Sequence, residues 1–103
     1  MANPQCENGY TKIANELLEA ICARLTNSTW IRVLLWTIRL TYGFCRKDVQ
    51  SSYQSYATKL NLTKDTIKTA LLDLHDRKII VLAVITKEQF VVTINKNYEL
   101  WKL

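Results

Sequence analysis

The sequence predicts a mainly α-helical domain with a small antiparallel β-hairpin, arranged as a winged helix-turn-helix. Residues 51–60 and 64–77 both show helical apolar spacing, and only three residues separate them. The period then changes, because two β-branched runs, residues 79–85 and 90–94, flank a four-residue polar turn. Two helices, a short break and a hairpin follow one another in this order in a winged helix-turn-helix.

Length and composition are those of one globular domain. The chain has 103 residues, of which 49% are apolar and 22% charged, so it has enough apolar material for a core. We therefore predict a single winged-helix DNA-binding domain over residues 1–103, with the helix-turn-helix at 51–77 and the wing at 79–94. No apolar run approaches the roughly 18 residues of a membrane span, so no membrane partner is expected.

An arm and a first helix are predicted before the helix-turn-helix. Residues 1–9 form an extended N-terminal arm in this prediction, because Pro4 and Asn8-Gly9 are turn signals. Residues 10–25 form an amphipathic helix, whose inner side chains recur every four residues. These side chains are Ile13, Leu17, Ile21 and Leu25, with Ala14 and Leu18 beside them.

Residues 29–42 form a more apolar second helix. Such a helix is buried centrally or covers a partner surface, so we predict a central core helix, with a dedicated dimer face as the alternative. Gly43 suits the left-handed position that ends a helix. Residues 44–50 are predicted as a short strand or an extended link. One face of the helix carries Ile31, Leu34, Leu35, Ile38 and Tyr42.

The helix pair has clear start and stop signals. Ser51-Ser52 can cap the first helix, Asn61 tolerates a positive φ in the break, and Thr63 can cap the second helix. The predicted buried faces are Tyr53, Tyr56, Ala57 and Leu60 in the first helix, and Ile67, Ala70, Leu71 and Leu74 in the second. After the hairpin, residues 98–101 form a terminal turn that can return two aromatic side chains to the core.

The charge distribution favours a polyanionic partner. The formal net charge is +5, and residues 1–23 sum to −2 whereas residues 24–103 sum to +7. Basic residues displace counterions from phosphates, which drives association with nucleic acid.

Composition argues against an enzyme. Gly9 and Gly43 are the two glycines, so no phosphate-cradling loop is present, and His75 is the only histidine. A zinc site has no ligand set at the required spacing, and a hydrolytic triad would need His75, which lies in a charged stretch typical of a solvated helix face. We therefore expect no catalysis, no cofactor and no metal.

The three cysteines indicate a reducing compartment. They are odd in number and widely spaced, and the polar N-terminus is unlike a secretory signal, so we expect a cytoplasmic protein with reduced thiols. Cys22 fits a buried helix position, whereas Cys6 and Cys45 are expected on the surface.

The candidate DNA-binding residues lie on the polar side of the second helix of the pair and on the wing. Lysine can donate to guanine, and threonine can bond to a base or offer its methyl group to thymine. Asp65 can accept from cytosine or simply stabilise the helix start. Lys87 and Gln89 at the wing tip, with Arg46 and Lys47 before the helix pair, suit phosphate contacts. The full candidate set is Thr63, Lys64, Asp65, Thr66, Lys68, Thr69, Ser52, Gln54, Arg46, Lys47, Lys87 and Gln89.

Several segments also resemble the N-terminal family of phage replication protein O, and together they cover essentially the whole chain. They are Asn3-Pro4-Gln5, Glu7-Asn8-Gly9-Tyr10-Thr11-Lys12-Ile13-Ala14-Asn15-Glu16-Leu17-Leu18-Glu19-Ala20, Thr41-Tyr42-Gly43-Phe44, Lys78-Ile79-Ile80 and Asn95-Lys96-Asn97-Tyr98-Glu99-Leu100-Trp101. The resemblance implies a winged-helix domain that recognises repeated sites in a phage origin and pairs on DNA. By the same resemblance, the helix from Thr63 to Arg77 is the recognition helix.

Three departures from that family leave alternatives open. Asn61-Leu62 stands where the family commonly has Gly-Leu, and the turn at residues 86–89 lacks glycine. The chain also stops at Leu103, before any helicase-recruiting region, as expected of an excised domain or of a short phage protein that kept only the module. A free-standing module suggests a repressor, or an antagonist that binds a protein of a host defence complex, as some anti-CRISPR proteins do. The charge of +5 argues against imitation of DNA.

Overall fold

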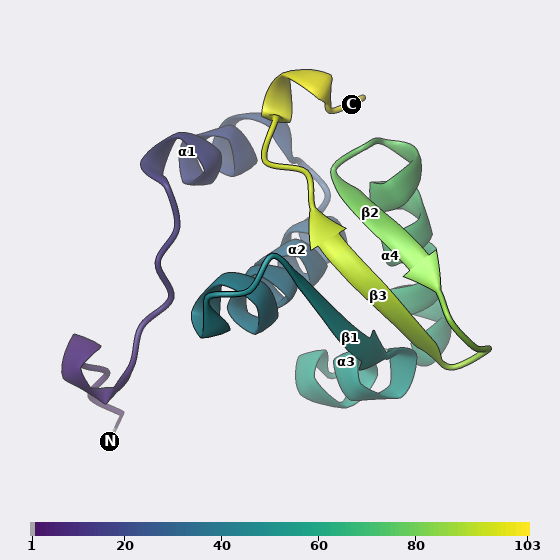
Figure 1. The fold of residues 1–103 in the computed structure, drawn as a ribbon, viewed down its shortest axis with the longest axis horizontal. Helices are drawn as coiled ribbons and strands as arrows, with labels where there is room; N and C mark the ends of the chain where they lie inside the picture. Colours follow the sequence, from purple (N-terminus) through teal and green to yellow (C-terminus); the bar gives the residue numbers. More distant parts are fainter. Residues whose placement is uncertain (1) are drawn as a thin grey trace.

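The computed structural model describes residues 2–103, which form four α-helices and three strands (Figure 1). The helices are α1 (Asn15–Arg24), α2 (Ser28–Thr41), α3 (Tyr53–Leu60) and α4 (Lys64–Asp76); the strands are β1 (Asp48–Ser52), β2 (Ile80–Val84) and β3 (Gln89–Ile94). The predicted class, mainly α with a small antiparallel hairpin, is confirmed, and α3, α4 and the hairpin follow in the predicted order.

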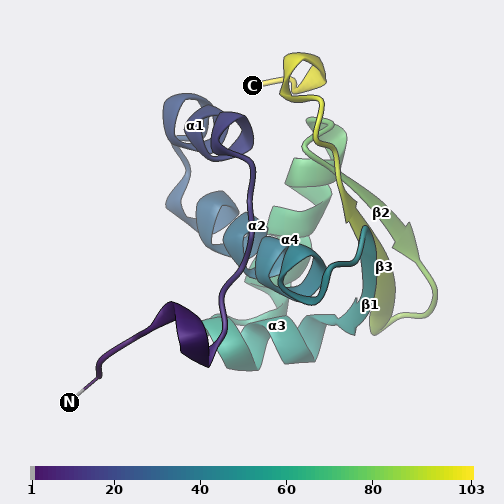
Figure 2. The ribbon, with the colours of Figure 1, turned by 60° about the vertical axis from the view of Figure 1, so that its left-hand side comes forward.

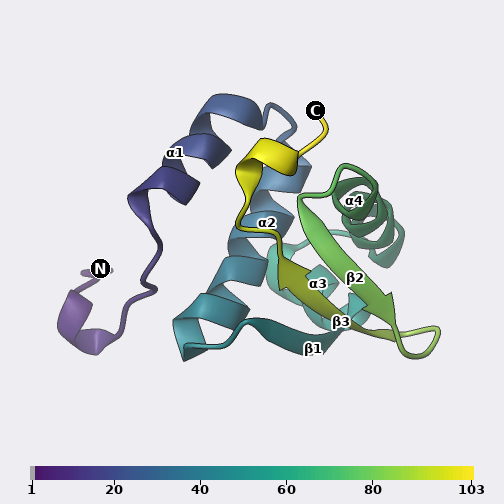
Figure 3. The ribbon, with the colours of Figure 1, turned by 45° about the horizontal axis from the view of Figure 1, so that its top comes forward.

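The hairpin is part of a three-stranded antiparallel sheet of order β1-β3-β2 (Figure 3). β2 and β3 pair from Ile80 opposite Ile94 to Val84 opposite Phe90. β1 joins the other edge of β3, so the open prediction for residues 44–50 resolves into a strand that begins only at Asp48. Tyr42–Phe44 forms a 3₁₀ turn instead.

Helix α2 runs through the centre of the molecule, in contact with α3, α4 and the sheet (Figure 2). Val33 and Leu34 are fully buried, so the predicted central core helix is confirmed. Its face is rotated from the predicted one, however: Thr37 and Thr41 are fully buried, whereas Leu35 is 44% exposed. The apolar pattern missed this rotation because both threonines satisfy their hydroxyls inside the core.

The buried hydroxyls form a short network between α2 and α3. Thr37 Oγ1 donates to the carbonyl of Val33 at 2.9 Å and lies 2.7 Å from Tyr56 Oη. Thr41 Oγ1 donates to the carbonyl of Thr37 at 2.8 Å. Burial raises the pKa of Tyr56 to about 12, and the hydrogen bond with Thr37 opposes this shift.

Helix α1 begins later than predicted. It starts at Asn15, and its N-cap Ala14 is extended and has no side-chain capping bond. Apolar periodicity did not locate this start, because the helix begins without a side-chain cap that would mark its first residue in the sequence. The arm is also less extended than predicted, since Cys6–Asn8 forms a 3₁₀ turn. The part of the predicted arm at Met1 lies outside the described residues.

The predicted caps of the helix pair are present. Ser52 Oγ accepts from the backbone N–H of Ser55 at 3.1 Å, and Thr63 Oγ1 accepts from that of Thr66 at 3.2 Å. Asn61 has a φ of 57°, as its residue type allows. The apolar stripe of α4 is buried as predicted: Ile67, Ala70, Leu71 and Leu74 are at most 3% exposed.

The C-terminal turn closes one end of the core. Trp101 is 6% exposed, and its Nε1 donates to the carbonyl of Asn95 at 2.9 Å. Tyr98 is half-buried under the Arg24 guanidinium, whose carbon lies 5.1 Å from the ring centroid. The sequence prediction for the cysteines was wrong at Cys22, which is exposed like Cys6 and Cys45 because it lies off the buried face of α1.

Candidate nucleic-acid interface

One end of the domain gathers most of the predicted DNA-binding residues. β2 runs back along α4, so the turn between β2 and β3 lies beside the first turn of α4 (Figure 1). β1 ends at the same place, because Ser52 pairs with Gln89 and the N–H of Tyr53 donates to the carbonyl of Glu88 at 3.1 Å. We call this end the reading face, defined by the exposed residues Lys64, Asp65, Lys68, Thr69 and Lys87.

Two of the predicted residues are occupied in capping the helix. The hydroxyls of Thr63 and Thr66 lie 2.8 Å apart, and Thr63 also accepts from the backbone of Thr66. Thr66 is half-buried. These two side chains therefore fix the start of α4, and the exposed side chains of the reading face are the ones that can reach a ligand.

The other candidate DNA-binding residues of α4 lie on two sides of the helix. Lys64 and Lys68 share the side toward the wing and α3: Lys64 Nζ lies 3.1 Å from Glu88 Oε2, and Lys68 Nζ lies 5.9 Å from the Tyr53 ring centroid. Asp65 and Thr69 line a hollow of about 350 Å³ on the other side of α4, toward the start of α2. That hollow is lined by Asn27, Thr29, Trp30, Asp65, Thr66, Thr69, Ala70 and Asp73.

The other predicted polar residues at this end are already hydrogen-bonded. Gln89 Oε1 accepts from Gln50 Nε2 at 3.1 Å, and Gln54 Nε2 donates to Thr58 Oγ1 at 2.9 Å. Ser52 caps α3 and is half-buried. Lys87 stands exposed in the turn. The lysines of the reading face are therefore the most accessible to a ligand, and the side-chain amides of Gln54 and Gln89 are held in fixed positions behind them.

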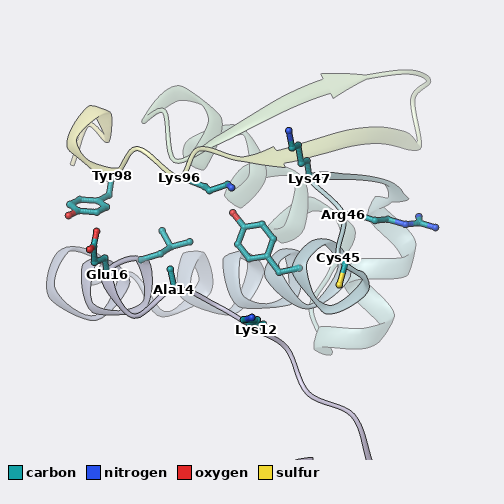
Figure 4. A pocket seen from close by; sticks show the side chains of 10 residues that line it. Lys12, Ala14, Glu16, Cys45, Arg46, Lys47, Lys96 and Tyr98 are labelled. Atoms are coloured by element: carbon teal, nitrogen blue, oxygen red, sulfur yellow. The ribbon is translucent and has the colours of Figure 1, made fainter.

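Arg46 and Lys47 do not join this end. They precede Asp48, which pairs with Thr93, whereas Ser52 pairs with Gln89 at the far end of β1. Four residue steps of strand separate Asp48 from Ser52, about 13 Å. Arg46 and Lys47 line a different hollow (Figure 4).

Charge on α4 is graded along the helix. Lys64 and Lys68 lie in its first half, together with Asp65, whereas Asp73 and Asp76 lie in its last turn and the one before it. Only the first half therefore favours a polyanion. His75 is exposed, but its Nδ1 accepts from the backbone N–H of Leu82 at 3.1 Å, so it fastens α4 to β2.

The sequence reasoning missed Glu88 and Tyr53. Glu88 pairs with Lys64 across the wing turn, and Tyr53 places its ring under Lys68. A turn of sequence Thr86-Lys87-Glu88-Gln89 contains the acidic residue, but its partner depends on the angle at which the hairpin leaves α4.

Neither a metal site nor a membrane span is found in residues 2–103. Within this range, no group of three or more His, Cys, Asp or Glu side chains is placed to hold a metal ion. Every helix in that range is too short or too polar to cross a bilayer.

Comparison with known protein families matches residues 3–101 to Bacteriophage replication protein O. The chain belongs to this family. The match covers nearly the whole sequence and confirms the resemblance seen in its segments. Searches of curated proteins and of solved structures give no significant match. Membership of the replication protein O family indicates a DNA-binding part in phage replication, and the family is generally non-enzymatic.

Proposed function

We propose that this chain binds duplex DNA sequence-specifically, as the origin-recognition domain of a phage replication initiator, with the reading face as its contact surface. The observation that carries the proposal is the placement of α4. Its apolar stripe is buried, and its first half is left exposed beside the wing turn. A helix of 13 residues is about 20 Å long, and such a helix fits the major groove.

Each exposed side chain then has a distinct role. Lys68 and Thr69 reach base edges from the middle of α4, and Asp65 accepts from a base amino group or only stabilises the helix start. Lys64 and Lys87 bind phosphates on either side of the groove. Ser52, Gln54 and Gln89 orient the domain on the backbone, and Thr63 and Thr66 hold the start of α4 in place.

The proposal assigns the whole chain to one DNA-binding domain, with the helix-turn-helix at 51–77 and the wing at 79–94. Two copies binding adjacent half-sites would double the contacted length, as expected of a family that reads repeated sites. The chain would bind the origin in the cytoplasm of the bacterial host cell, where phage DNA is replicated.

The decisive experiment is a fluorescence-anisotropy titration with duplexes tiled across the phage origin and with shuffled duplexes of the same composition. Lys68→Ala and Thr69→Ala should each weaken origin binding by about 1–3 kcal/mol and reduce the preference over shuffled DNA. Lys87→Ala should weaken binding to both kinds of duplex equally. Lys102→Ala serves as the matched control, because it removes a charge at the other end of α4, where the N–H of Lys102 donates to the carbonyl of Arg77.

Salt dependence gives an independent readout. With about three phosphates neutralised per protomer by Lys64, Lys68 and Lys87, the slope of log affinity against log salt should be roughly −3. A flat salt response, or Lys68→Ala and Thr69→Ala variants that bind origin DNA as well as the natural chain, would refute DNA recognition by this face. The second outcome, with biological activity retained, would favour a protein-binding accessory factor.

A further inference from the structure

A second basic hollow lies around the start of β1, away from the reading face. It has a volume of about 490 Å³. Three segments build it: the chain entering α1, the link before β1 and the chain leaving β3 (Figure 4). The lining includes four cationic residues, Lys12, Arg46, Lys47 and Lys96, from positions up to 84 residues apart in the sequence, and the Arg46 side chain points outward from the hollow (Figure 4). One carboxylate, Glu16, also lines the hollow, beside Tyr98 and at the other end from Arg46 and Lys47 (Figure 4).

The four cations have no ionic partner among the residues that the structure describes. Among residues 2–103 the one ion pair is that between Lys64 and Glu88, at the other end of β1. No carboxylate lies within 4.0 Å of Lys12, Arg46, Lys47 or Lys96 there, although Glu16 lines the same hollow. The hollow therefore has an uncompensated positive charge that an anionic ligand would neutralise.

A buried hydroxyl group also favours a ligand with hydrogen-bond acceptors. Tyr42 lines the hollow, and its hydroxyl is buried without a hydrogen-bond partner. A buried hydroxyl without a partner costs stability, so a ligand that brings an acceptor would be favoured. Burial also raises the pKa of Tyr42 above its ordinary value of 10.0. Lys96 Nζ lies 5.9 Å from the Tyr42 ring centroid.

The rest of the lining is apolar. Leu17 is buried in the core beneath it, and the rings of Tyr42 and Tyr98 stand half-buried at its edge. Phosphates carry no apolar group to bury against such a surface, and the carboxylate of Glu16 would repel a continuous phosphate chain. A flexible peptide can instead place carboxylates on the cations and an apolar side chain against Leu17 and the rings.

We propose that this hollow binds an acidic peptide segment of a protein partner, which inserts one apolar side chain between its carboxylates. The inference does not depend on DNA binding by α4. Because the start of β1 lies about 13 Å from its end at the reading face, a peptide here would leave that face open. In this assignment Lys47 contacts a carboxylate and not a DNA phosphate, and Arg46 adds positive charge beside the hollow.

The test uses the full chain and labelled synthetic peptides in anisotropy titrations. The probe contains Asp and Glu residues around a single Phe; one control has Ser in place of Phe, and another has Asn and Gln in place of the acids. We expect saturable binding of the probe that weakens with salt, and weaker binding of both controls. The double variant Lys47→Gln, Lys96→Gln should lower probe affinity by about tenfold or more, as for lost charge-assisted hydrogen bonds.

Tyr42→Phe separates the hydroxyl from the ring. It should weaken the probe while it preserves or raises thermal stability, because it removes a buried donor without a partner. Lys68→Ala should leave probe binding unchanged, and the double variant should leave the origin-DNA preference unchanged, so failure of one proposal is distinguishable from failure of the other. No saturable binding of the probe, equal binding of the uncharged control, or an equal loss of duplex DNA binding in the double variant would overturn the peptide assignment.

Discussion

At the scale of single residues, the contact between Lys64 and Glu88 controls how much positive charge the reading face offers. Both side chains are about half exposed, so the pair itself contributes little to stability. Glu88→Gln should free Lys64 and remove an anion from the reading face, which should strengthen DNA binding severalfold and steepen the salt dependence by about one unit. Anisotropy titrations over a salt series measure both effects. Glu99→Gln, an exposed change on the C-terminal turn, is the control; equal gains in both variants would contradict a specific role for Glu88.

The hydroxyl pair of Thr37 and Tyr56 predicts an unequal response to two similar losses. Tyr56→Phe removes a hydrogen bond but leaves Thr37 donating to Val33, so it should cost about 0.5–1.5 kcal/mol. Thr37→Val keeps the volume but strands the buried Tyr56 hydroxyl, so it should cost more, about 1–3 kcal/mol. Urea unfolding of both variants tests the order. A larger loss for Tyr56→Phe would show that the ring contact with Phe90, whose centroid lies 5.5 Å away, is disturbed as well.

At the scale of elements, both helices of the pair end in the same way. After α3, the N–H of Leu62 donates to Ala57; after α4, the N–H of Ile79 donates to Leu74, in each case around a left-handed residue. Asn61 accepts that conformation readily, whereas Lys78, with a φ of 61°, does not. The chain therefore enters β2 through a strained position.

Lys78→Gly should relieve this strain and stabilise the protein by about 0.5–1 kcal/mol, since the lower cost of the left-handed region exceeds the entropy lost by glycine. Lys78→Ala loses the same charge but keeps the Cβ atom, so it should give no gain. Thermal unfolding of the two variants compares them directly. A stabilisation that is equal in both would assign the effect to charge and leave the backbone uninvolved.

The elements were more predictable from sequence than their contacts. The caps at Ser52 and Thr63 and the stripe of α4 could be predicted because each depends on neighbours within one or two helical turns. The choice between a strand and an extended link at residues 44–50 could not be made, because the strand needs β3 as its partner. The burial of Thr37 and Thr41 could not be predicted either, because the threonines need backbone and Tyr56 partners that only the folded chain supplies. The position of Lys64 could be predicted for the same reason as the caps, because it depends on its own helix. The positions of Arg46 and Lys47 could not, because they depend on how β1 pairs with β3.

At the scale of the whole molecule, Tyr56 joins α3 to α2 and to the sheet, and its titration should therefore be felt in global stability. Its pKa is about 12 in the folded protein and 10.0 by ordinary reference. The folded state thus holds the Tyr56 proton more tightly than the unfolded state. The contribution of this group to the free energy of unfolding is therefore complete below pH 10 and is lost as pH rises from about 10 to 12. Two units correspond to roughly 2–3 kcal/mol. Urea midpoints should fall across this window, and they should fall less in Tyr56→Phe; an equal fall would exclude Tyr56 as the cause.

The pairing of β1 with β3 also determines how the molecule would respond to mechanical tension. The chain enters β1 at Asp48 and leaves β3 near Ile94, at the same end of the sheet, while Ser52 and Gln89 meet at the other end. A pull on the two termini would open the rungs one after another from the Asp48 end, as in a zipper. The rung nearest the reading face would open last. Within this strand pair, tension from a tethered neighbour would therefore open the far rungs before the rung beside the reading face.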